Sequence, residues 1–469
     1  MIHKPTGLKF KTKPWQHQLK ALQYLMGRDF SALYTDPGTG KTKVMIDLIN
    51  NKDFNTTLIV CPKKAMDVWE QEFSKHSLNQ NIQVLNTKDM TVERKSSEVK
   101  KINSLQLKIG QPMVIIINYD SIWRQPLKQV LLKMKFDAII CDESHRIKSP
   151  SSKVSKFLTA LGRRSSHRYL VTGTPLSQSP LDIYAQYRFL NPEIFGTRFD
   201  DFKYQYANFV KANGYEFIDK KKPYKNLDEL HEKMFSCAFH DKSSVVLPPT
   251  QDIIVDFQLP PKIQKYYSDF KKESCLEFED GDIIAENVLS SILRLQQLCS
   301  GYLPIIDENN KKITKEIDNT RINVLKDLVE DFEADEPLVI FCKYRKDIND
   351  VLQLCKDMKI SVSEVSGKKD ELKAWKDGWT RVIVVQIKAG AESIDLTRAR
   401  YCIYYNLDYS LINWTQSRKR VHRPNQKHSV VYYILVAKHK KCKTIDEKIL
   451  ESLENNLNVV QSIMEDREI

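Results

Sequence analysis

The chain has 469 residues, enough for two or three domains that each enclose a hydrophobic core. It is 41% hydrophobic and 28% charged, as in ordinary globular proteins, and no apolar run reaches the length of a membrane span, so no membrane partner is expected. Lys and Arg exceed Asp and Glu by 73 − 60 = 13, which favours a polyanionic partner, although excess lysine can also serve solubility alone.

The N-terminal stretch MIHKPTGLKFKTKPW lacks the apolar segment of a secretory signal peptide. The nine cysteines are scattered and form neither a CxxC pair nor a Cys/His cluster. We therefore expect no zinc site, no disulfide framework and a reducing compartment.

Short apolar runs alternate with amphipathic segments over the first part of the chain. The runs are rich in β-branched residues and hydrophobic almost throughout, as expected of strands buried on both faces of a parallel sheet. Amphipathic segments such as KVMIDLINN and AMDVWEQEFSKH lie between them and predict covering helices. The predicted strands are residues 31–35, 56–61, 113–118, 137–141 and 168–172.

The same alternation returns late in the chain, so we predict a second α/β domain with a parallel sheet. Its predicted strands are residues 337–342, 359–365, 381–387, 400–406 and 429–437. The region between the two domains loses the alternation and becomes helical and aromatic, and paired prolines bracket an extended connector, VVLPPTQDIIVDFQLPP. The predicted parts are a first lobe (1–190), its helical and aromatic protrusion (191–245), a connector with a helical protrusion of the second lobe (246–315), and the second lobe (316–469).

The stretch LYTDPGTGKTKVMIDLI has the arrangement of a phosphate-binding loop. A predicted strand runs into Gly38-Thr39-Gly40-Lys41-Thr42 and then into an amphipathic helix. Glycines let backbone N–H groups turn toward phosphate oxygens, and the helix N-terminus adds its positive end. Lys41 is expected to reach the β- and γ-phosphates and Thr42 to hold Mg²⁺. Thr35 stands where the strict pattern has glycine, and a Gly-rich turn with a solvated lysine is the alternative.

Two acids and a histidine follow the predicted strand that ends at Cys141. Taken alone, Asp142-Glu143-Ser144-His145 is equally typical of a polar loop. A phosphate loop on a neighbouring parallel strand, however, needs an acid at the carboxyl edge of the sheet to hold Mg²⁺. Asp142 is the predicted metal ligand, and Glu143 is the predicted group that orients and deprotonates the attacking water. His145 is predicted to couple the site to other elements.

GTGKT followed by DESH resembles the motifs of helicase superfamily two. Further stretches narrow the resemblance to the Swi/Snf-type (Snf2-like) ATPases over nearly the whole chain: LIVCPKKAMDVWEQEF, VIIINYDSI, CDESHRIKS, YLVTGTPLSQSPLDIYAQYRFLNPEIFG, LVIFCKYRKDIND, KAGAESIDLTRA and QSRKRVHRPNQ. The resemblance implies two RecA-like parallel-sheet lobes with helical insertions. It also implies ATP and Mg²⁺ as ligands, double-stranded or branched DNA as the partner, and a compact form without accessory chromatin modules.

The resemblance assigns further site residues. Gln18 in KPWQHQ matches the adenine-reading glutamine, and Thr172 and Thr174 match the segment that links nucleotide state to lobe position. The last motif supplies Gln416, Arg420 and Arg423, whose arginines reach the nucleotide from the second lobe in the family.

The arginine assignment also has a physical basis. Charge builds on the γ-phosphoryl oxygens in the transition state, and a guanidinium placed there accelerates hydrolysis by about 10³-fold or more. For the adjacent Arg418 and Lys419 a plain basic helix face is the favoured interpretation.

Translocation requires phosphate contacts on both lobes, and residues that follow predicted strands are the candidates for DNA binding. Each is equally well explained as a solvated loop residue. The candidates are Lys63, Lys64, Asn118, Tyr119, Arg146 and Lys148 on the first lobe, and Lys343, Arg345, Lys388 and Thr397 on the second.

The tract RFDDFKYQYANFVKANGYEFIDKKKPYK, residues 198–225, is both aromatic and basic. Aromatics in such a tract usually form the core of a small helical protrusion. The alternative is a wedge that separates strands, or a grip on branched DNA.

Three functions fit these observations. The first is an ATP-dependent translocase on double-stranded or branched DNA, the second an unwinding or branch-migration helicase in repair or recombination, and the third a non-motor DNA-binding scaffold switched by nucleotide. The complete set Lys41, Asp142, Glu143, Arg420 and Arg423 argues against the third. We expect a monomer that meets replication or recombination proteins in the cytoplasm of a bacterial or phage-infected cell, or in the nucleus of a eukaryote.

Overall fold

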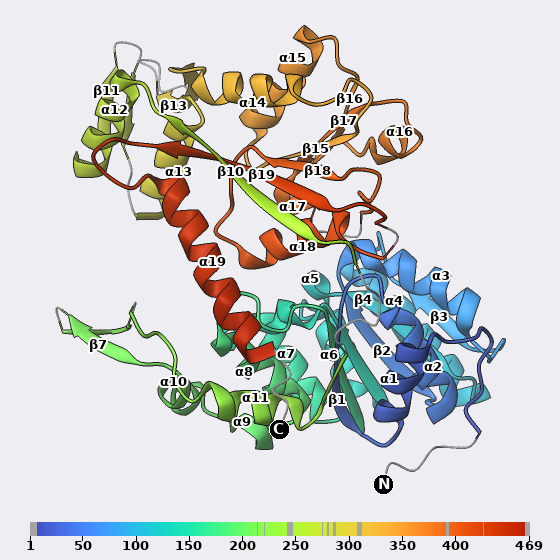
Figure 1. Cartoon of the computed structure of the whole chain (residues 1–469). Coiled ribbons are helices and arrows are strands. Elements are labelled where there is room, and N and C mark those ends of the chain that lie inside the picture. The colour runs from blue at the N-terminus through green and yellow to red at the C-terminus, as the bar shows by residue number, and fades with distance from the viewer. Residues whose placement is uncertain are drawn as a thin grey trace. The chain divides into compact units, whose positions relative to one another are not determined.

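The computed structural model describes residues 7–212, 214–219, 221–241, 247–273, 275–278, 281–284, 288–306, 312–390, 394–424 and 426–464. The chain forms two compact units (Figure 1). Unit 1 comprises Met1–Val246 together with Asn458–Ile469, and unit 2 comprises Leu247–Leu457.

Unit 1 is built on a seven-stranded sheet in which every strand pair is parallel. All five strands predicted for the first domain are present and buried, because both faces of the sheet are covered. In spatial order the strands are β3 (Gln83–Asn86), β4 (Met113–Asn118), β2 (Thr56–Cys61), β5 (Ala138–Asp142), β6 (His167–Thr172), β1 (Phe30–Thr35) and β9 (Ala238–Asp241).

Alternate residues of each strand enter two separate hydrophobic cores. In β2, Ile59 packs with the helices α1 (Gln16–Met26), α2 (Lys41–Lys52) and α3 (Met66–His76). Leu58 and Val60 face the other core. The helices of that second layer are α4 (Val92–Ile109), α5 (Tyr119–Ile122), α6 (Leu127–Lys133), α7 (Lys153–Gly162) and α8 (Ile183–Leu190).

The strand order brings three separate sequence motifs to one edge of this sheet. β6 lies between β5 and β1, and Tyr34 and Asp142 stand in register with Thr172 and Val171 of β6. The loops that follow β1, β5 and β6 therefore emerge side by side.

Residues 191–241 form the protrusion expected after the first lobe, but they are not wholly helical. They comprise α9 (Pro192–Phe195), α10 (Phe199–Tyr206), a hairpin of β7 (Phe209–Ala212) and β8 (Tyr215–Ile218), α11 (Leu227–Phe235) and the sheet strand β9. Phe202 and Tyr206 of α10 are 1% and 0% exposed and extend the core of unit 1, as the helical interpretation of the aromatic tract predicted. The final turns of α19 (Ile445–Met464) complete the same core through Ile463.

Unit 2 contains a six-stranded parallel sheet, and all five predicted strands are present. In spatial order they are β10 (Thr250–Gln258), β19 (Val430–Lys438), β18 (Tyr401–Tyr404), β15 (Leu338–Cys342), β17 (Val382–Gln386) and β16 (Val362–Val365). The segment predicted as an extended connector contributes β10, which pairs with β19 along its whole length. Being an edge strand, β10 keeps most side chains accessible and so lacks the continuous apolar run of a buried strand.

The helices of unit 2 are α12 (Pro261–Glu273), α13 (Val288–Cys299), α14 (Thr320–Glu330), α15 (Arg345–Asp357), α16 (Leu372–Lys376), α17 (Ile387–Gly390) and α18 (Leu411–Val421). The insertion after β10 also holds an antiparallel sheet that was not predicted, made of β11 (Cys275–Phe278), β12 (Gly281–Ile284), β13 (Tyr302–Ile306) and β14 (Lys312–Glu316). None of the helices described in either unit is long and apolar enough to cross a membrane.

Candidate nucleotide site and nucleic-acid contacts

The predicted phosphate loop lies between β1 and α2 of unit 1. Gly38 and Gly40 have φ angles of 86° and 80°, a conformation that glycine adopts without steric cost. Gly40 is the N-cap of α2, and Lys41 and Thr42 open the helix. The backbone therefore has the strand, loop and helix N-terminus that the sequence motif predicted.

The side chains of the loop are held by the loop itself. Lys41 Nζ donates to the carbonyl oxygens of Thr35 and Asp36 at 2.9 and 3.1 Å. Thr39 Oγ1 lies 2.7 Å from the Asp36 carbonyl oxygen and 3.1 Å from Thr35 Oγ1. The threonine that replaces the usual first glycine thus contributes a hydroxyl contact within the loop.

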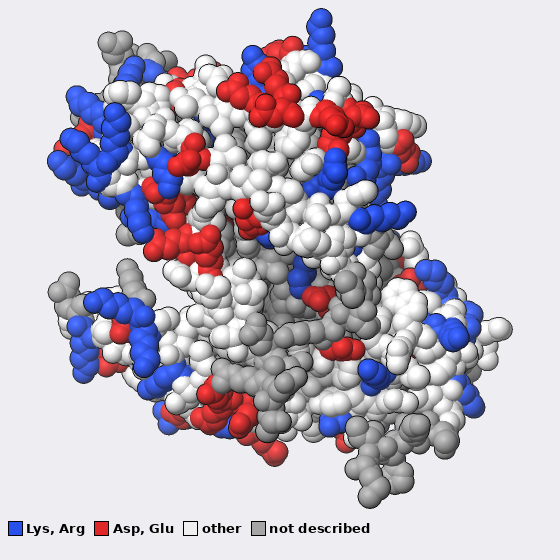
Figure 2. Space-filling view, in the orientation of Figure 1, with Lys and Arg blue, Asp and Glu red and all other residues white. Residues whose placement is uncertain are grey.

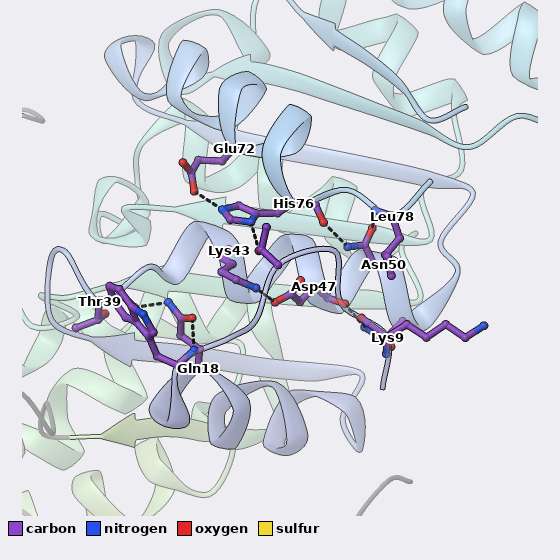
Figure 3. Close-up of polar contacts among 12 residues, drawn as sticks. Lys9, Gln18, Thr39, Lys43, Asp47, Asn50, Glu72, His76 and Leu78 are labelled. Carbon is purple, nitrogen blue, oxygen red and sulfur yellow. Dashed lines mark hydrogen bonds and ion pairs between the residues drawn. The ribbon is translucent and has the colours of Figure 1, made fainter. Parts of the chain in front are cut away.

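An N-terminal segment is fastened to this loop through Gln18, as Figure 3 shows. Gln18 Nε2 donates to the Thr39 carbonyl at 3.0 Å, and its Oε1 accepts from the Trp15 backbone N–H at 2.9 Å. A Cβ atom on Gly40 would lie 2.2 Å from Gln18 Nε2, so a larger residue would require Gln18 to move, and the φ of 80° itself favours glycine. The Trp15 side chain is 54% exposed beside this contact. An adenine-reading role for Gln18 stays a prediction.

Polar contacts lie along helix α2 beyond the phosphate loop (Figure 3). Lys43 Nζ pairs with Asp47 Oδ2 at 2.5 Å, both side chains being less than 10% exposed. Asn50 Nδ2 donates to the His76 carbonyl at 3.0 Å and its Oδ1 accepts from the Leu78 N–H at 3.1 Å. The two Asn50 bonds hold α2 against the end of α3 and the segment that follows it, and the Lys43–Asp47 pair lies within α2 itself. The helix that follows the phosphate loop is thereby fixed.

Asp142 ends β5 at the same edge of the sheet. Its Oδ2 accepts a hydrogen bond of 2.9 Å from Trp69 Nε1, and its Oδ1 accepts one of 2.9 Å from the Glu143 N–H. Desolvation, with the neighbouring Glu143 charge, raises the pKa of Asp142 to about 6. The carboxylate is therefore oriented by two donors, and a cation bound to it would lower that pKa.

Glu143, His145, Thr172 and Thr174 form a cluster that joins the acid motif to the loop after β6. His145 Nδ1 lies 3.4 Å from Glu143 Oε2, 3.3 Å from Thr172 Oγ1 and 3.5 Å from Thr174 Oγ1. The Thr172 hydroxyl donates to Glu143 Oε2 at 3.4 Å and accepts from the Thr174 N–H at 3.1 Å. Burial lowers the pKa of His145, which keeps the imidazole neutral at pH 7.

Gly173 brings this cluster against the start of the phosphate loop. A Cβ atom on Gly173 would lie 2.9 Å from Pro37 Cδ and 3.0 Å from the Thr35 carbonyl oxygen. The two loops thus pack closely at Gly173, where there is no room for a side chain.

The residues present fit a nucleoside triphosphate with Mg²⁺. Mg²⁺ is commonly held by one or two carboxylates together with phosphate oxygens and waters. Asp142 and the Thr42 hydroxyl are the residues that would hold the ion in this way. No cluster of three or more His, Cys, Asp or Glu side chains suited to a metal occurs among the described residues, so a protein-only metal cage is not found there.

The residues of the last predicted motif lie in unit 2. Gln416 is 8% exposed on α18, Arg420 lies near the end of that helix, and Arg423 Nη1 donates to the Ile394 carbonyl at 3.4 Å. Arg418, predicted as part of a plain basic face, instead makes two bonds of 2.6 and 2.9 Å to Asp252 of β10.

Two of the residues predicted to contact DNA on the first lobe have buried side chains with partners inside unit 1. Asn118 and Tyr119 are only 7% and 3% exposed. Asn118 Oδ1 accepts from Lys95 Nζ at 2.6 Å, and the Tyr119 hydroxyl donates to the Asp142 carbonyl at 2.6 Å. Tyr119 thereby supports the acid motif.

All ten candidates stay predictions, and the surroundings of the other eight differ. Lys63, Lys64, Arg146 and Lys388 are exposed, with Lys63 Nζ 2.8 Å from Asp89. The remaining four have partners within their own unit: Lys148 lies 3.3 Å from Asp182, Lys343 bonds to Gln296 at 2.6 Å, Arg345 pairs with Glu364, and the Thr397 hydroxyl donates to Asp395 at 2.8 Å.

Sequence reasoning missed Trp69, Gly173 as a contact with Pro37, and the supporting role of Tyr119. The signal for Trp69 was weak, because its segment was identified as an amphipathic helix and as part of the family resemblance, and neither assigns a role to the tryptophan. The contact with Asp142 depends on how α3 packs against the sheet.

The chain was compared with known families. Residues 17–302 match the SNF2-related domain, and residues 320–425 match the helicase conserved C-terminal domain.

Its curated relatives are distant. It is 23% identical to a DNA repair and recombination protein RAD54-like from Drosophila ananassae, over 92% of this chain and 59% of the relative. Identity is 24% with human DNA repair and recombination protein RAD54B, over 91% and 51%, and 23% with an uncharacterized ATP-dependent helicase, MG018, of Mycoplasma genitalium, over 92% and 40%. The chain therefore spans about half the length of the curated relatives it matches.

Among solved structures, the chain resembles a Sulfolobus solfataricus SWI2/SNF2 ATPase core in complex with double-stranded DNA. The TM-score is 0.43 at 19% identity, and the match covers 99% of this chain and 95% of that one. The SNF2-related match covers more than half of the chain and the helicase C-terminal match follows it in order. The chain accordingly belongs to the SNF2-related family of helicase-like ATPases.

Proposed function

We propose that this protein is an ATP-dependent translocase that moves on double-stranded or branched DNA and remodels DNA structures or protein–DNA complexes. The observation that carries the proposal is the Glu143, His145, Thr172 and Thr174 cluster beside the phosphate loop. A site that only hydrolyses ATP needs the acids and the loop. A motor also needs a contact between the catalytic acid and another element, because hydrolysis must change the position of that element. Here His145 and Thr172 connect Glu143 to the loop after β6.

The net charge of the chain and the names of its relatives support DNA as the polymer on which the protein moves. The excess of 13 basic residues suits a polyanion, and relatives in this family are named for DNA repair and recombination. In the proposed reaction Glu143 orients and deprotonates the water, and Lys41 neutralises charge on the transferred phosphoryl group. Mg²⁺, held by Asp142 and Thr42, would supply further charge neutralisation.

The test is ATP turnover measured side by side with no DNA, single strands, plain duplex, forks and four-way junctions. Stimulation by plain duplex is expected of a double-strand translocase. A triplex-displacement assay then detects movement without strand separation, and a tailed-duplex assay detects unwinding. Displacement without unwinding supports the translocase, whereas unwinding of tailed duplexes or junctions supports a branch-migration helicase. Turnover that no DNA changes would contradict both.

A further inference from the structure

The hairpin β7–β8 of unit 1 carries aromatic side chains that do not join the core. Tyr215 and Phe217 are 71% and 53% exposed, and Val210 is 44% exposed. Isolated surface aromatics are common, but three large apolar side chains close together on one small element call for a partner.

The strand register places these three side chains on one face. Val210 stands opposite Phe217, and Tyr215 lies two residues before Phe217 on the same strand, so all three point the same way. The Tyr215 and Phe217 rings are 6.5 Å apart. We call this surface of Val210, Tyr215 and Phe217 the aromatic face.

The opposite face of the hairpin is already occupied. Tyr204 of α10 packs its ring 4.9 Å from the Phe209 ring and donates a hydrogen bond of 2.7 Å to Glu216, and Lys203 Nζ lies over Phe209 at 4.9 Å. Lys211 Nζ lies 3.6 Å from the same Glu216 carboxylate. Helix α10 therefore supports one face of the hairpin, and the aromatic face is the one left accessible.

The hairpin is held in place at its base. Asn208 accepts a backbone bond of 3.0 Å from Asp219 N–H and donates one of 3.0 Å to Pro223, and its side chain donates to the Lys222 carbonyl at 2.8 Å. An isolated hairpin is only marginally stable, so these bonds fix the orientation of the aromatic face.

The surroundings of the aromatic face are basic. Residues 203–225 contain six lysines and two acids in the sequence, and Figure 2 shows lysine side chains gathered over this hairpin. Lys221, Lys222 and Lys225 are exposed where the chain returns along the hairpin base. One of the two acids, Glu216, is engaged by Tyr204 and Lys211 on the opposite face.

We propose that the aromatic face binds unpaired bases of branched DNA, with the lysines at the hairpin base contacting the phosphates on either side. The proposal deepens the proposed function, on which it rests, by naming the DNA structure that the protein prefers. Paired bases are hidden within the duplex, whereas unpaired bases expose faces on which aromatic rings stack, each stack contributing roughly 1–3 kcal/mol. The exposed rings could equally well bind a protein partner, but the lysines beside them favour a polyanion such as DNA.

The experiment compares DNA affinity without ATP for the wild-type chain and the double variant Tyr215→Ala/Phe217→Ala, using single strands, plain duplex and the same duplex with unpaired arms. Affinity for single strands and armed duplex should fall by about 30-fold or more, because two stacks of roughly 1–3 kcal/mol each are lost, and affinity for plain duplex should not change. The pair Tyr215→Phe/Phe217→Tyr keeps both rings and should retain affinity. Leu105→Ala/Leu107→Ala, which removes side chains 44% and 76% exposed on α4 of the same unit, is the matched control.

A second readout follows stacking directly. A 2-aminopurine placed at the first unpaired position beside the branch should be quenched by the wild-type chain and not by the double variant. Unchanged affinity of the double variant for unpaired DNA would overturn the proposal. An equal loss for duplex and armed DNA would also overturn it. Binding without ATP separates this outcome from failure of the motor, which would appear as wild-type turnover that DNA does not stimulate.

Discussion

Trp69 Nε1 donates a hydrogen bond of 2.9 Å to Oδ2 of Asp142, so a buried tryptophan of α3 orients the predicted magnesium ligand at the end of β5. The bond favours the charged carboxylate and opposes the rise in pKa caused by desolvation. Positioning partners of this kind commonly change metal affinity 10-fold to 100-fold when removed.

The Trp69→Phe variant is therefore expected to need about 10-fold more Mg²⁺ for half-maximal ATP turnover, with a smaller change in the rate at saturating Mg²⁺. Trp375→Phe is the matched control, because Trp375 is also fully buried and its Nε1 donates to the Arg381 carbonyl at 3.3 Å in unit 2. An unchanged Mg²⁺ requirement in Trp69→Phe would contradict the positioning role.

Mg²⁺ binding should depend on pH through Asp142, whose pKa is raised to about 6. The ion requires the deprotonated carboxylate, so its affinity and the rate of hydrolysis at limiting Mg²⁺ should rise as the pH increases through about 6 and level off above it. In the ion-free protein the raised pKa of Asp142 makes the folded state less stable as the pH increases, whereas it makes Mg²⁺ binding stronger. The folded state keeps a proton that the unfolded state has released between about pH 4 and 6, so this group's contribution to the free energy of unfolding falls across that window.

Mg²⁺ titrations at about pH 5.5, 6.5 and 7.5 measure the first effect. Thermal unfolding of the ion-free protein at about pH 4.5, 5.5 and 6.5, compared with Asp142→Asn, measures the second. Equal Mg²⁺ affinity at all three values would contradict the assignment.

The Thr172→Val variant tests the coupling cluster, because it removes the hydroxyl that contacts both Glu143 and the Thr174 N–H. DNA stimulation of ATP turnover is expected to fall about 10-fold, as for the loss of a positioning hydrogen bond. Thr57→Val is the control: Thr57 is buried in the same sheet, and its hydroxyl has no hydrogen-bond partner in the structure, so valine should be tolerated. Equal DNA stimulation of ATP turnover in the two variants would show that the cluster does not couple DNA binding to hydrolysis.

Alanine variants of three arginines should differ in effect. Arg418 is expected to have a structural role, and Arg420 and Arg423 a catalytic one. Arg418→Ala removes the bonds to Asp252 and the stacking of the guanidinium 3.9 Å from the Tyr432 ring. It should destabilise the pairing of β10 by roughly 1–3 kcal/mol and speed hydrogen exchange there. Arg420→Ala and Arg423→Ala should instead lower ATP turnover by about 10³-fold with little change in unfolding temperature. Turnover lost only in Arg418→Ala would reverse this assignment.

Both parallel sheets could be predicted because their central strands are continuous apolar runs. β2 and β4 are buried at every position, and their sequences reflect it. β10 was missed as a strand because an edge position leaves its polar residues accessible, and β9 was missed because it is only four residues long. Burial on both faces leaves a continuous apolar run that can be recognised in the sequence. Whether a polar or short segment pairs as a strand depends instead on the neighbouring strands of the folded sheet.

Some residues of the candidate site could be predicted from the sequence, and others could not. Gly38, Gly40, Asp142 and Glu143 were found because their chemistry requires neighbouring residues in a fixed order. Tyr119 was assigned to DNA because it follows a strand, yet β4 lies close enough to β5 for its hydroxyl to reach Asp142. Local spacing cannot tell whether a residue at the sheet edge points inward or outward.

The central claim is that Glu143 performs the hydrolytic step of an ATPase whose turnover depends on DNA. The most direct test is the Glu143→Gln variant, with ATP affinity and duplex-stimulated turnover measured on the same preparation, and Glu98→Gln on α4 as the matched surface control. We predict that Glu143→Gln binds ATP as the wild type does and loses turnover by at least about 100-fold, since the charge on the base is removed and the loop is left intact. Stimulated turnover at the wild-type rate in Glu143→Gln would contradict the account.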